Sequence, residues 1–233
     1  MYFDSRPIPE LRTLSFNGRE IEWVEEYKYL GLTITNKMSY FIHINNVVNH
    51  VSRFVGTFHC LRKVLPRSVL LMLYSSFVMP HIPLHIEIWG SAPAVYLSKL
   101  DIKINMLLRS IVGVKYIDFR PVLHTTDMYN QLGILKLKNV FKLRFYSLLV
   151  SLLNGSRPEL FDLILAPYLK DHNHTTINRM FRIPLVLSEV ERRAASYQLI
   201  NVYQDLPPQY CITERNSQST LVRSFKRFLL SMQ

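Results

Sequence analysis

Hydrophobic and polar residues follow two different periods in this chain, and the first forty residues carry the shorter one. Residues 13–16 and 21–24 flank Asn17-Gly18, which predicts a β-hairpin because Asn-Gly readily adopts the positive φ angles of a tight turn. Residues 29–34 have side chains of alternating character and include the β-branched Thr33 and Ile34, a pattern that predicts another strand. Gly31 within that strand indicates a bulge or a close backbone approach.

From residue 44 onward the period becomes that of an α-helix. The apolar residues recur at steps of three and four and form one stripe: Ile44, Val47, Val48, Val51, Phe54, Val55, Phe58 and Leu61. Pro66 is expected to end this helix. Four more helices are predicted: one that begins at Val69 and ends before Pro80, and others over residues 94–112, 136–153 and 219–232. Beyond residue 156, prolines divide the chain into short pieces.

The predicted fold is therefore mainly α. A short N-terminal β-hairpin region is expected over residues 1–40, a helical domain over residues 41–113 and a C-terminal helical region over residues 114–233. Trp89 is expected in the core, since it lies in an apolar run. Lys99 and Lys103 lie opposite the apolar stripe of the third helix, on its outer side.

Composition excludes several classes of protein. The 233 residues are 48% hydrophobic, enough for a sizeable core. Two cysteines do not make a disulfide framework and no secretion signal is evident, so an intracellular protein is expected. The densest apolar run, residues 69–78, has about half the roughly 20 residues of a spanning helix, so no membrane partner is expected.

The net charge of +11 is unevenly distributed. Residues 1–40 hold five Lys and Arg against six Asp and Glu, whereas the remaining residues hold 23 against 11. A basic excess of this kind is typical of a domain that binds a polyanion, because each neutralised phosphate releases counterions. A membrane surface, or a protein that is simply basic and soluble, is the alternative.

Candidate catalytic residues are few. Polymerases use two metal ions held by clustered carboxylates, but none of the seven aspartates here is adjacent to another. The glutamates at 20, 22, 25 and 26 fit a solvated face of the hairpin better than a metal site, and the histidines lack the ligand spacing of a zinc site. We therefore predict no catalytic residue and no metal or other cofactor in this chain.

Short motifs follow one another along almost the whole chain. In chain order they are Lys28-Tyr29-Leu30-Gly31, His43-Ile44, Leu61-Arg62 with Leu65-Pro66, Leu73-Tyr74-Ser75-Ser76-Phe77, Pro80-His81-Ile82, Ile88-Trp89-Gly90, Leu107-Leu108-Arg109-Ser110-Ile111-Val112-Gly113, Leu132-Gly133-Ile134-Leu135, Arg157-Pro158-Glu159-Leu160, His172-Asn173-His174-Thr175, Leu206-Pro207 and Ser224-Phe225-Lys226. This ordered series resembles the C-terminal part of the reverse transcriptases of non-LTR (LINE, jockey-like) retrotransposons.

The resemblance implies that the β region is the exit of the palm and its primer-supporting hairpin, followed by a thumb-like helical bundle and a C-terminal helical subdomain. In the hairpin, Lys28 would meet a phosphate, Tyr29 would stack on or support the strand, and Gly31 would permit close approach. In the bundle, the cations expected to face phosphates are Arg53, Lys63, Lys99, Lys103 and Arg109. Core packing for Tyr29 and a solvated helix face for the cations are the alternatives.

Three functions remain open from the sequence. The first is a fragment of a retrotransposon RNA-directed DNA polymerase, which would hold a primer–template duplex but lacks the catalytic aspartates. Its partners would be nucleic acid and the missing palm and fingers, and Mg²⁺ would belong to the intact parent enzyme. The second is a stand-alone basic nucleic-acid-binding module, and the third is a non-catalytic scaffold for protein interactions. In each case the isolated chain is expected to be inactive as a polymerase.

Overall fold

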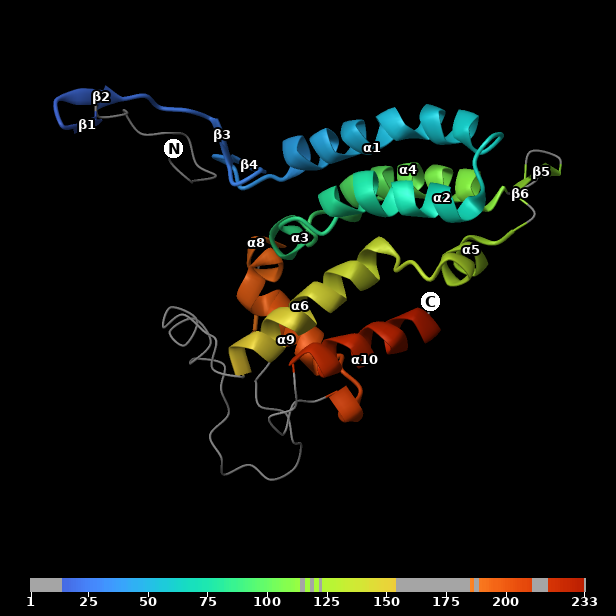
Figure 1. The fold of residues 1–233 in the computed structure, drawn as a ribbon. Helices are drawn as coiled ribbons and strands as arrows, with labels where there is room; N and C mark the ends of the chain where they lie inside the picture. The colour runs from blue at the N-terminus through green and yellow to red at the C-terminus, as the bar shows by residue number, and fades with distance from the viewer. Residues whose placement is uncertain are drawn as a thin grey trace.

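The computed structural model describes residues 14–113, 116–117, 120–121, 123–153, 185–186, 189–210 and 218–232. This part of the chain is mainly helical, with three short antiparallel strand pairs, as the sequence predicts for the fold class. The helices form two layers joined by a short segment (Figure 1). None of the helices in the described ranges is both long enough and apolar enough to cross a bilayer.

The predicted N-terminal hairpin is present. Strand β1 (Leu14–Phe16) pairs with β2 (Arg19–Ile21) around Asn17-Gly18, both of which have positive φ angles. The second strand begins at Arg19, two residues earlier than expected, because a two-residue turn brings the strands together at once. The hairpin stands apart from the helices, so all its strand residues are exposed (Figure 1).

The prediction of one strand over residues 29–34 is wrong. That segment is the tip of a second hairpin, in which β3 (Glu26–Tyr29) pairs with β4 (Leu32–Thr35). Leu30 and Gly31 form the two-residue turn, with φ angles of 47° and 90°. Gly31 therefore supplies a positive φ angle rather than a bulge, and Leu30 adopts one despite its side chain.

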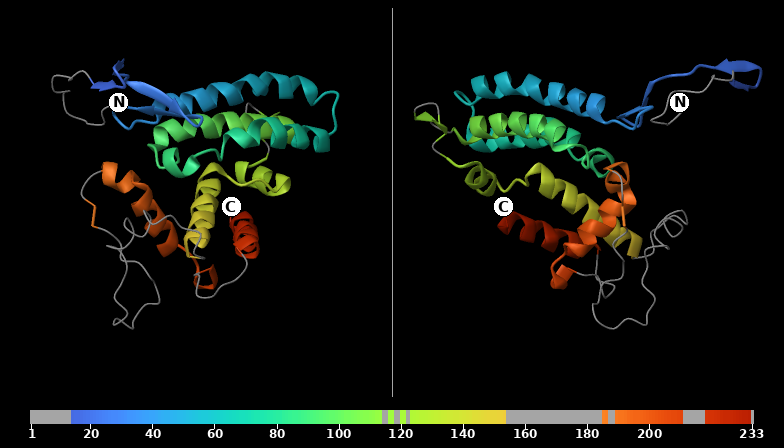
Figure 2. Two further views of the ribbon diagram at one scale, coloured as in Figure 1. Left: turned by 60° about the vertical axis from the view of Figure 1, so that its left-hand side comes forward. Right: turned by 180° about the vertical axis from the view of Figure 1, so that it is seen from behind.

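The first helical layer consists of α1 (Phe41–Leu61), α2 (Arg67–Leu73) and α4 (Ala94–Val112). Helices α1 and α2 both pack on α4, as the views in Figure 2 also show. The predicted apolar stripes face this contact, and Ile44, Val51, Leu100 and Leu107 are fully buried. The second predicted helix continues beyond α2 as a π-helical turn (Tyr74–Val78) and a 3₁₀ turn (Met79–His81), ending at the prolines as expected.

The second layer contains α6 (Leu137–Leu153), which packs against α9 (Ala195–Gln204) and α10 (Gln218–Ser231). Helices α6 and α10 match their predictions, and Phe225 of α10 is buried while Lys226 and Arg227 are exposed. The elements that the sequence did not indicate are α3 (Ile86–Trp89), α5 (Thr125–Leu132), α8 (Glu189–Arg193), α9, and the short strands β5 (Tyr116–Ile117) and β6 (Arg120–Pro121).

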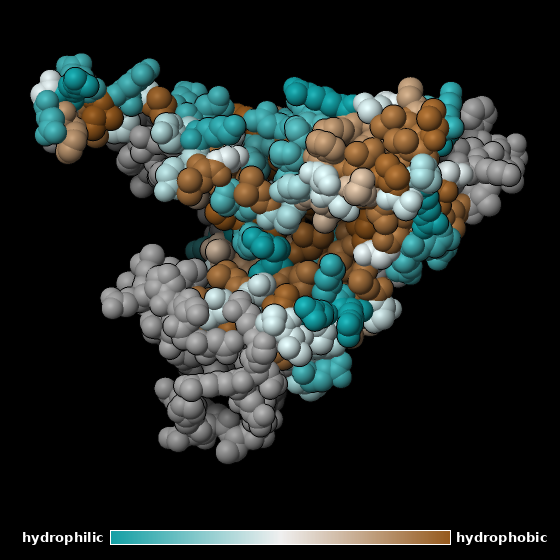
Figure 3. Space-filling view, in the orientation of Figure 1, coloured by the Kyte–Doolittle hydropathy of each residue, from teal (hydrophilic) through white to brown (hydrophobic). Residues whose placement is uncertain are grey.

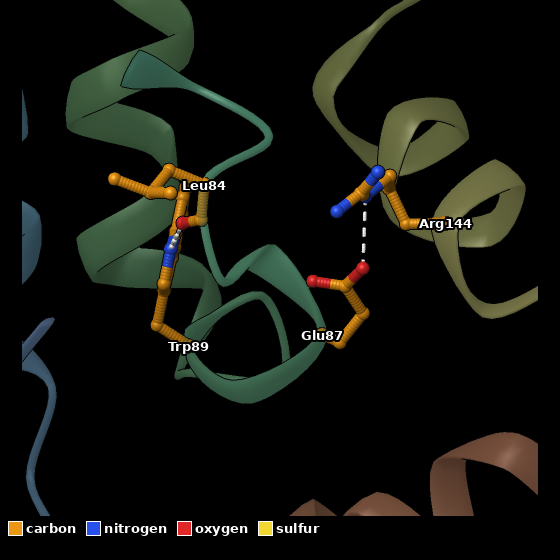
Figure 4. A network of polar contacts seen from close by, with 4 residues as sticks. All are labelled: Leu84, Glu87, Trp89 and Arg144. Carbon is orange, nitrogen blue, oxygen red and sulfur yellow. Dashed lines mark hydrogen bonds and ion pairs between the residues drawn. The ribbon is translucent and has the colours of Figure 1, made fainter. Parts of the chain in front are cut away.

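The segment around α3 joins the two layers. Trp89 is fully buried, as predicted, and its indole Nε1 donates a hydrogen bond of 2.7 Å to the carbonyl of Leu84. Glu87 accepts from Arg144 of α6, with 2.8 Å between Oε1 and Nε (Figure 4). Gly90 lies against Phe141 of α6, so closely that a side chain would not fit there. The core is therefore continuous from the first layer into the second.

Candidate nucleic-acid interface

The β3–β4 turn carries the first group of predicted site residues. Lys28 and Tyr29 lie on β3, and both side chains are exposed. The turn is fastened to the segment before α3: His85 Nε2 lies 2.8 Å from the carbonyl oxygen of Leu30. A Cβ atom at Gly31 would lie 3.4 Å from Cδ2 of Leu84, an ordinary van der Waals distance, so it is the positive φ angle and not a lack of space that favours glycine here.

His43 lies beneath this turn and holds it from the helical side. The backbone N–H of Thr33 donates to His43 Nδ1 at 3.4 Å, and the imidazole ring lies 5.8 Å from the Trp89 ring. Burial, together with the charges of His85 and Lys28, lowers the pKa of His43 to about 4. The ring is therefore neutral at physiological pH, and it can accept the Thr33 hydrogen bond.

Two predicted cations lie on or next to α1. Arg53 is on the outer face of the helix and Lys63 follows its C-terminal end, and both are exposed. The sequence around them is free of acidic residues: residues 27–86 contain no Asp or Glu but six Lys and Arg. From Tyr27 of β3 to the end of α1 the chain therefore presents positive charge with no carboxylate of its own, and the acidic residue of the hairpin, Glu26, lies at the end of β3 away from the turn.

The cations of α4 separate into two positions. Lys99 is exposed, and its Nζ lies 5.4 Å from the centroid of the Phe41 ring, a cation–π contact. Lys103 follows one turn later on the same side of the helix. Arg109 is half-buried and lies ten residues further along α4, about 15 Å from Lys99 along the helix axis, where its charge partly offsets the burial that raises the pKa of Tyr129 in α5. Arg109 therefore lies apart from Lys99.

Aromatic residues lie beside these cations, and the sequence did not indicate that they belong to the candidate site. The Phe41 and Tyr96 rings contact each other with centroids 5.0 Å apart, at the N-terminal ends of α1 and α4. Lys99 completes this group, and we call Phe41, Tyr96 and Lys99 the aromatic–basic cluster. In the sequence the cluster is indicated only by an aromatic residue near the start of each helix. The packing of α1 on α4 is what brings the two helix starts together.

The eight predicted residues do not converge on one point. Helix α1 has 21 residues and is about 30 Å long, with Phe41 at one end and Lys63 beyond the other. Lys28, Tyr29, Gly31 and Lys99 lie toward the first end, and Arg53 lies between the ends. A spread of this kind suits an extended ligand better than a small molecule.

A hydrophobic surface covers the C-terminal half of α1 and the adjoining α2 (Figure 3). In this stretch of the chain, Val64, Met72 and Phe77 are large apolar residues with 81%, 60% and 53% of their surface exposed. The Phe77 ring stacks on Phe54 of α1 at 6.3 Å between centroids. Apolar side chains of this kind offer nothing to a phosphate and are more typical of a protein contact.

Two cavities adjoin the joint between the layers. The smaller, of about 490 Å³, lies between α4, α6 and α9. Its charges balance: Lys142 Nζ lies 3.5 Å from Asp205 Oδ2, and the other charged lining residues are Lys138 and Asp101. Burial raises the pKa of the Asp101 carboxyl. The larger cavity lies at the start of α4. Within the described ranges, no three His, Cys, Asp or Glu side chains lie close enough together to hold a metal ion.

Comparison with known proteins gives one relationship. No profile of a known protein family matches the chain, and no solved structure is significantly similar to it. The chain is similar to the RNA-directed DNA polymerase from mobile element jockey of Drosophila melanogaster, with 29% identity over 129 residues. The match covers 53% of this chain and 13% of the fly protein. Of the motifs behind the resemblance, those at residues 157–160 and 172–175 lie outside the described residues. The chain therefore contains a region related to a non-LTR retrotransposon reverse transcriptase.

Proposed function

We propose that this chain holds a primer–template duplex along the layer formed by α1 and α4, as the thumb and primer-supporting hairpin of a reverse transcriptase would. The observation that carries the proposal is the acid-free segment 27–86, which includes the turn of the β3–β4 hairpin and the whole of α1 and displays exposed cations along about 30 Å. A nucleic-acid strand presents about nine phosphates over that length. The relationship to the jockey polymerase supports the same substrate class.

The proposed roles differ between the residues. Lys28, Arg53, Lys63, Lys99 and Lys103 would contact phosphates, while Tyr29, which is 58% exposed, would stack on or support the primer strand. Arg109 has the weakest support, because it lies toward α5. Residues 41–113 would then form the thumb-like domain and residues 114–233 the C-terminal helical region.

We expect the affinity for a primer–template duplex to fall by about fortyfold when salt is raised from 50 to 200 mM, if three phosphates are neutralised. Each phosphate contact releases counterions, so the logarithm of the affinity falls linearly with the logarithm of the salt concentration. Fluorescence anisotropy of a labelled 20-base-pair RNA–DNA duplex measures this directly.

Matched charge variants locate the surface. The triple variant Lys28→Gln, Arg53→Gln, Lys99→Gln should bind at least about tenfold more weakly and with a shallower salt dependence. The control Arg223→Gln, Lys226→Gln, Arg227→Gln removes the same charge from exposed positions of α10 in the second layer. Equal losses in the two variants, or an affinity indifferent to salt, would contradict the proposed surface.

The hydrophobic surface of Val64, Met72 and Phe77 favours a second candidate function, a scaffold that contacts another protein. Such a contact would depend on these side chains and little on salt. Duplex binding that is absent at 50 mM salt would favour the scaffold over the thumb.

We also expect no nucleotide incorporation by the isolated chain. Polymerase chemistry needs clustered carboxylates for two metal ions, and none of the seven aspartates is adjacent to another. A primer-extension assay with Mg²⁺ or Mn²⁺ checks this, and extension by the purified chain would overturn it.

A further inference from the structure

The hydrophobic surface over α1 and α2 (Figure 3) follows a seam between two segments of the chain. On one side is the C-terminal half of α1, and on the other are α2 and the π-helical turn that continues it. Ring contacts close the seam: Phe54 stacks on Phe77, and the His50 ring lies 3.9 Å from the ring of His81, measured between centroids. Phe77 is nevertheless mainly exposed, so the seam opens to solvent on its outer side.

Apolar side chains continue along both sides of the seam. Some are partly buried and pack against the core, whereas others project into solvent. The partly buried residues are Phe54, Leu61, Leu65 and Leu73, and the exposed ones are Val64, Met72 and Phe77. A patch of large apolar side chains that is open to solvent marks a contact with another molecule.

The charges that border this surface are all positive. One lies on α1 and three lie in or beside the connection from α1 to α2: Arg53, Arg62, Lys63 and Arg67. Segment 27–86 contains no Asp or Glu, and none of the four cations forms an ion pair with a described residue. Arg67 donates instead to the neutral backbone carbonyl of Gln131, at 3.0 Å. The surface is therefore electrostatically complementary to an acidic partner.

Apolar and charged features together select among the possible partners. A symmetric contact with a second copy of this chain would use the same patch twice and bring like charges together. A nucleic-acid strand would match the cations but not Val64 or Met72. An anionic bilayer takes up side chains that project from a surface, whereas half of this patch is sunk against the core. An amphipathic helix packs its apolar ridge along such a seam and can carry acidic residues beside it.

We propose that this surface binds an acidic amphipathic helix of another protein. The apolar face of that helix packs along the seam against Met72 and Phe77, and its carboxylates lie opposite the four bordering cations. The apolar contacts supply most of the affinity, while the cations select the partner and speed association. The inference names a partner for the second candidate function and does not depend on duplex binding.

Two matched peptides test the chemistry of the partner. Each is a fluorescein-labelled, lactam-stapled helix of about 18 residues with leucines on one face, and the other positions are glutamate in one peptide and lysine in the other. Fluorescence anisotropy with the whole chain measures their binding. We expect the lysine peptide to bind at least about tenfold more weakly, because it brings like charges together. Between 50 and 200 mM salt, the affinity for the glutamate peptide should change by less than about fivefold, since exposed ion pairs contribute little.

Substitutions on the chain locate the contact. The Met72→Ser and Phe77→Ser variants should each bind the glutamate peptide at least about fivefold more weakly, because each removes an apolar anchor. The matched control is Ile102→Ser, which removes a side chain that is 56% exposed on the opposite side of α4 from its buried stripe. Met72 is mainly exposed, so its substitution leaves the core unchanged and keeps the test valid if Phe77→Ser unfolds.

Three outcomes would overturn the inference: no binding of the glutamate peptide up to about 1 mM, equal affinity for the two peptides, or equal losses in the Met72→Ser and Ile102→Ser variants. Binding to vesicles of phosphatidylserine and phosphatidylcholine that requires Met72, without peptide binding, would assign the surface to a membrane instead. Salt-dependent duplex binding without peptide binding would refute this surface alone. Peptide binding in a chain that binds no duplex would refute the proposed duplex surface and retain this one.

Discussion

Replacing Gly90 with alanine is expected to lower the free energy of unfolding by about 3 kcal/mol, at the upper end of the usual cost of overpacking. The new Cβ would lie 2.5 Å from the carbonyl oxygen of Ile86 and closer still to Cδ2 of Phe141. The backbone at Gly90 is in the right-handed helical region, with φ −70°, so the cost is steric and not conformational. Urea denaturation followed by circular dichroism measures the change.

The Gly56→Ala variant is the matched control. Gly56 is exposed in the middle of α1, and a Cβ there would meet nothing within 4 Å. Alanine at that position should stabilise the protein by about 0.5–1 kcal/mol, since glycine is a poor helix former. The two variants make the same chemical change in opposite environments, so their effects should differ in sign.

A Gly90→Ala variant as stable as the wild type would contradict the close packing of α3 on α6. That contact joins the layer with the proposed duplex surface to the second layer and bounds the smaller cavity.

Lowering the pH from 6.5 to 4 is expected to cost the fold up to about 3 kcal/mol through His43 alone. The pKa of His43 is lowered from 6.5 to about 4 by burial, with smaller contributions from His85 and Lys28. Between these two pH values the unfolded chain binds a proton at this position and the folded chain does not. The free energy of unfolding is therefore not reduced by His43 above pH 6.5, and it falls as the pH drops toward 4.

The His43→Gln variant tests this assignment, because glutamine keeps an acceptor for the Thr33 N–H and does not titrate. Urea denaturation at pH 7, 6 and 5 should show a smaller loss in this variant than in the wild type. The pKa of His81 is lowered as well, by burial and by the charge of His50, so a residual loss in the same direction is expected. Identical losses in the two proteins would exclude His43 as the source.

Long amphipathic helices could be predicted from the sequence because their apolar stripes repeat over several turns. Helix α4 has the predicted bounds, and α6 and α10 lie within one residue of theirs. Helix α1 begins three residues before the predicted stripe and ends at Leu61, before the expected stop at Pro66. Short elements left no such signal: α3 has four residues between Pro83 and Gly90, and α8 and α9 lie in the part of the chain interrupted by prolines. The turn at Leu30-Gly31 was missed because leucine rarely adopts a positive φ angle.

The candidate site likewise contains some residues whose exposure the sequence could predict and others whose surroundings it could not. Exposure of Arg53, Lys63 and Lys99 followed from their places opposite the apolar stripes. Arg109 could not be placed this way, because its surroundings depend on α5, an element that the sequence did not reveal. The pairing of Phe41 with Tyr96 joins residues 55 positions apart, and no local pattern indicates such a contact.

The sequence by itself determined the helical class, the acid-free segment 27–86 and the relationship to a retrotransposon reverse transcriptase, because periodicity, charge and motifs are written along the chain. Only the tertiary structure decided that the Tyr29-Leu30-Gly31 motif is the tip of a hairpin held by His43 and His85. It alone also brought Phe54 and Phe77 into ring contact on one hydrophobic surface. The reason is physical: such a site is made where elements pack together, and packing joins residues that the sequence keeps far apart.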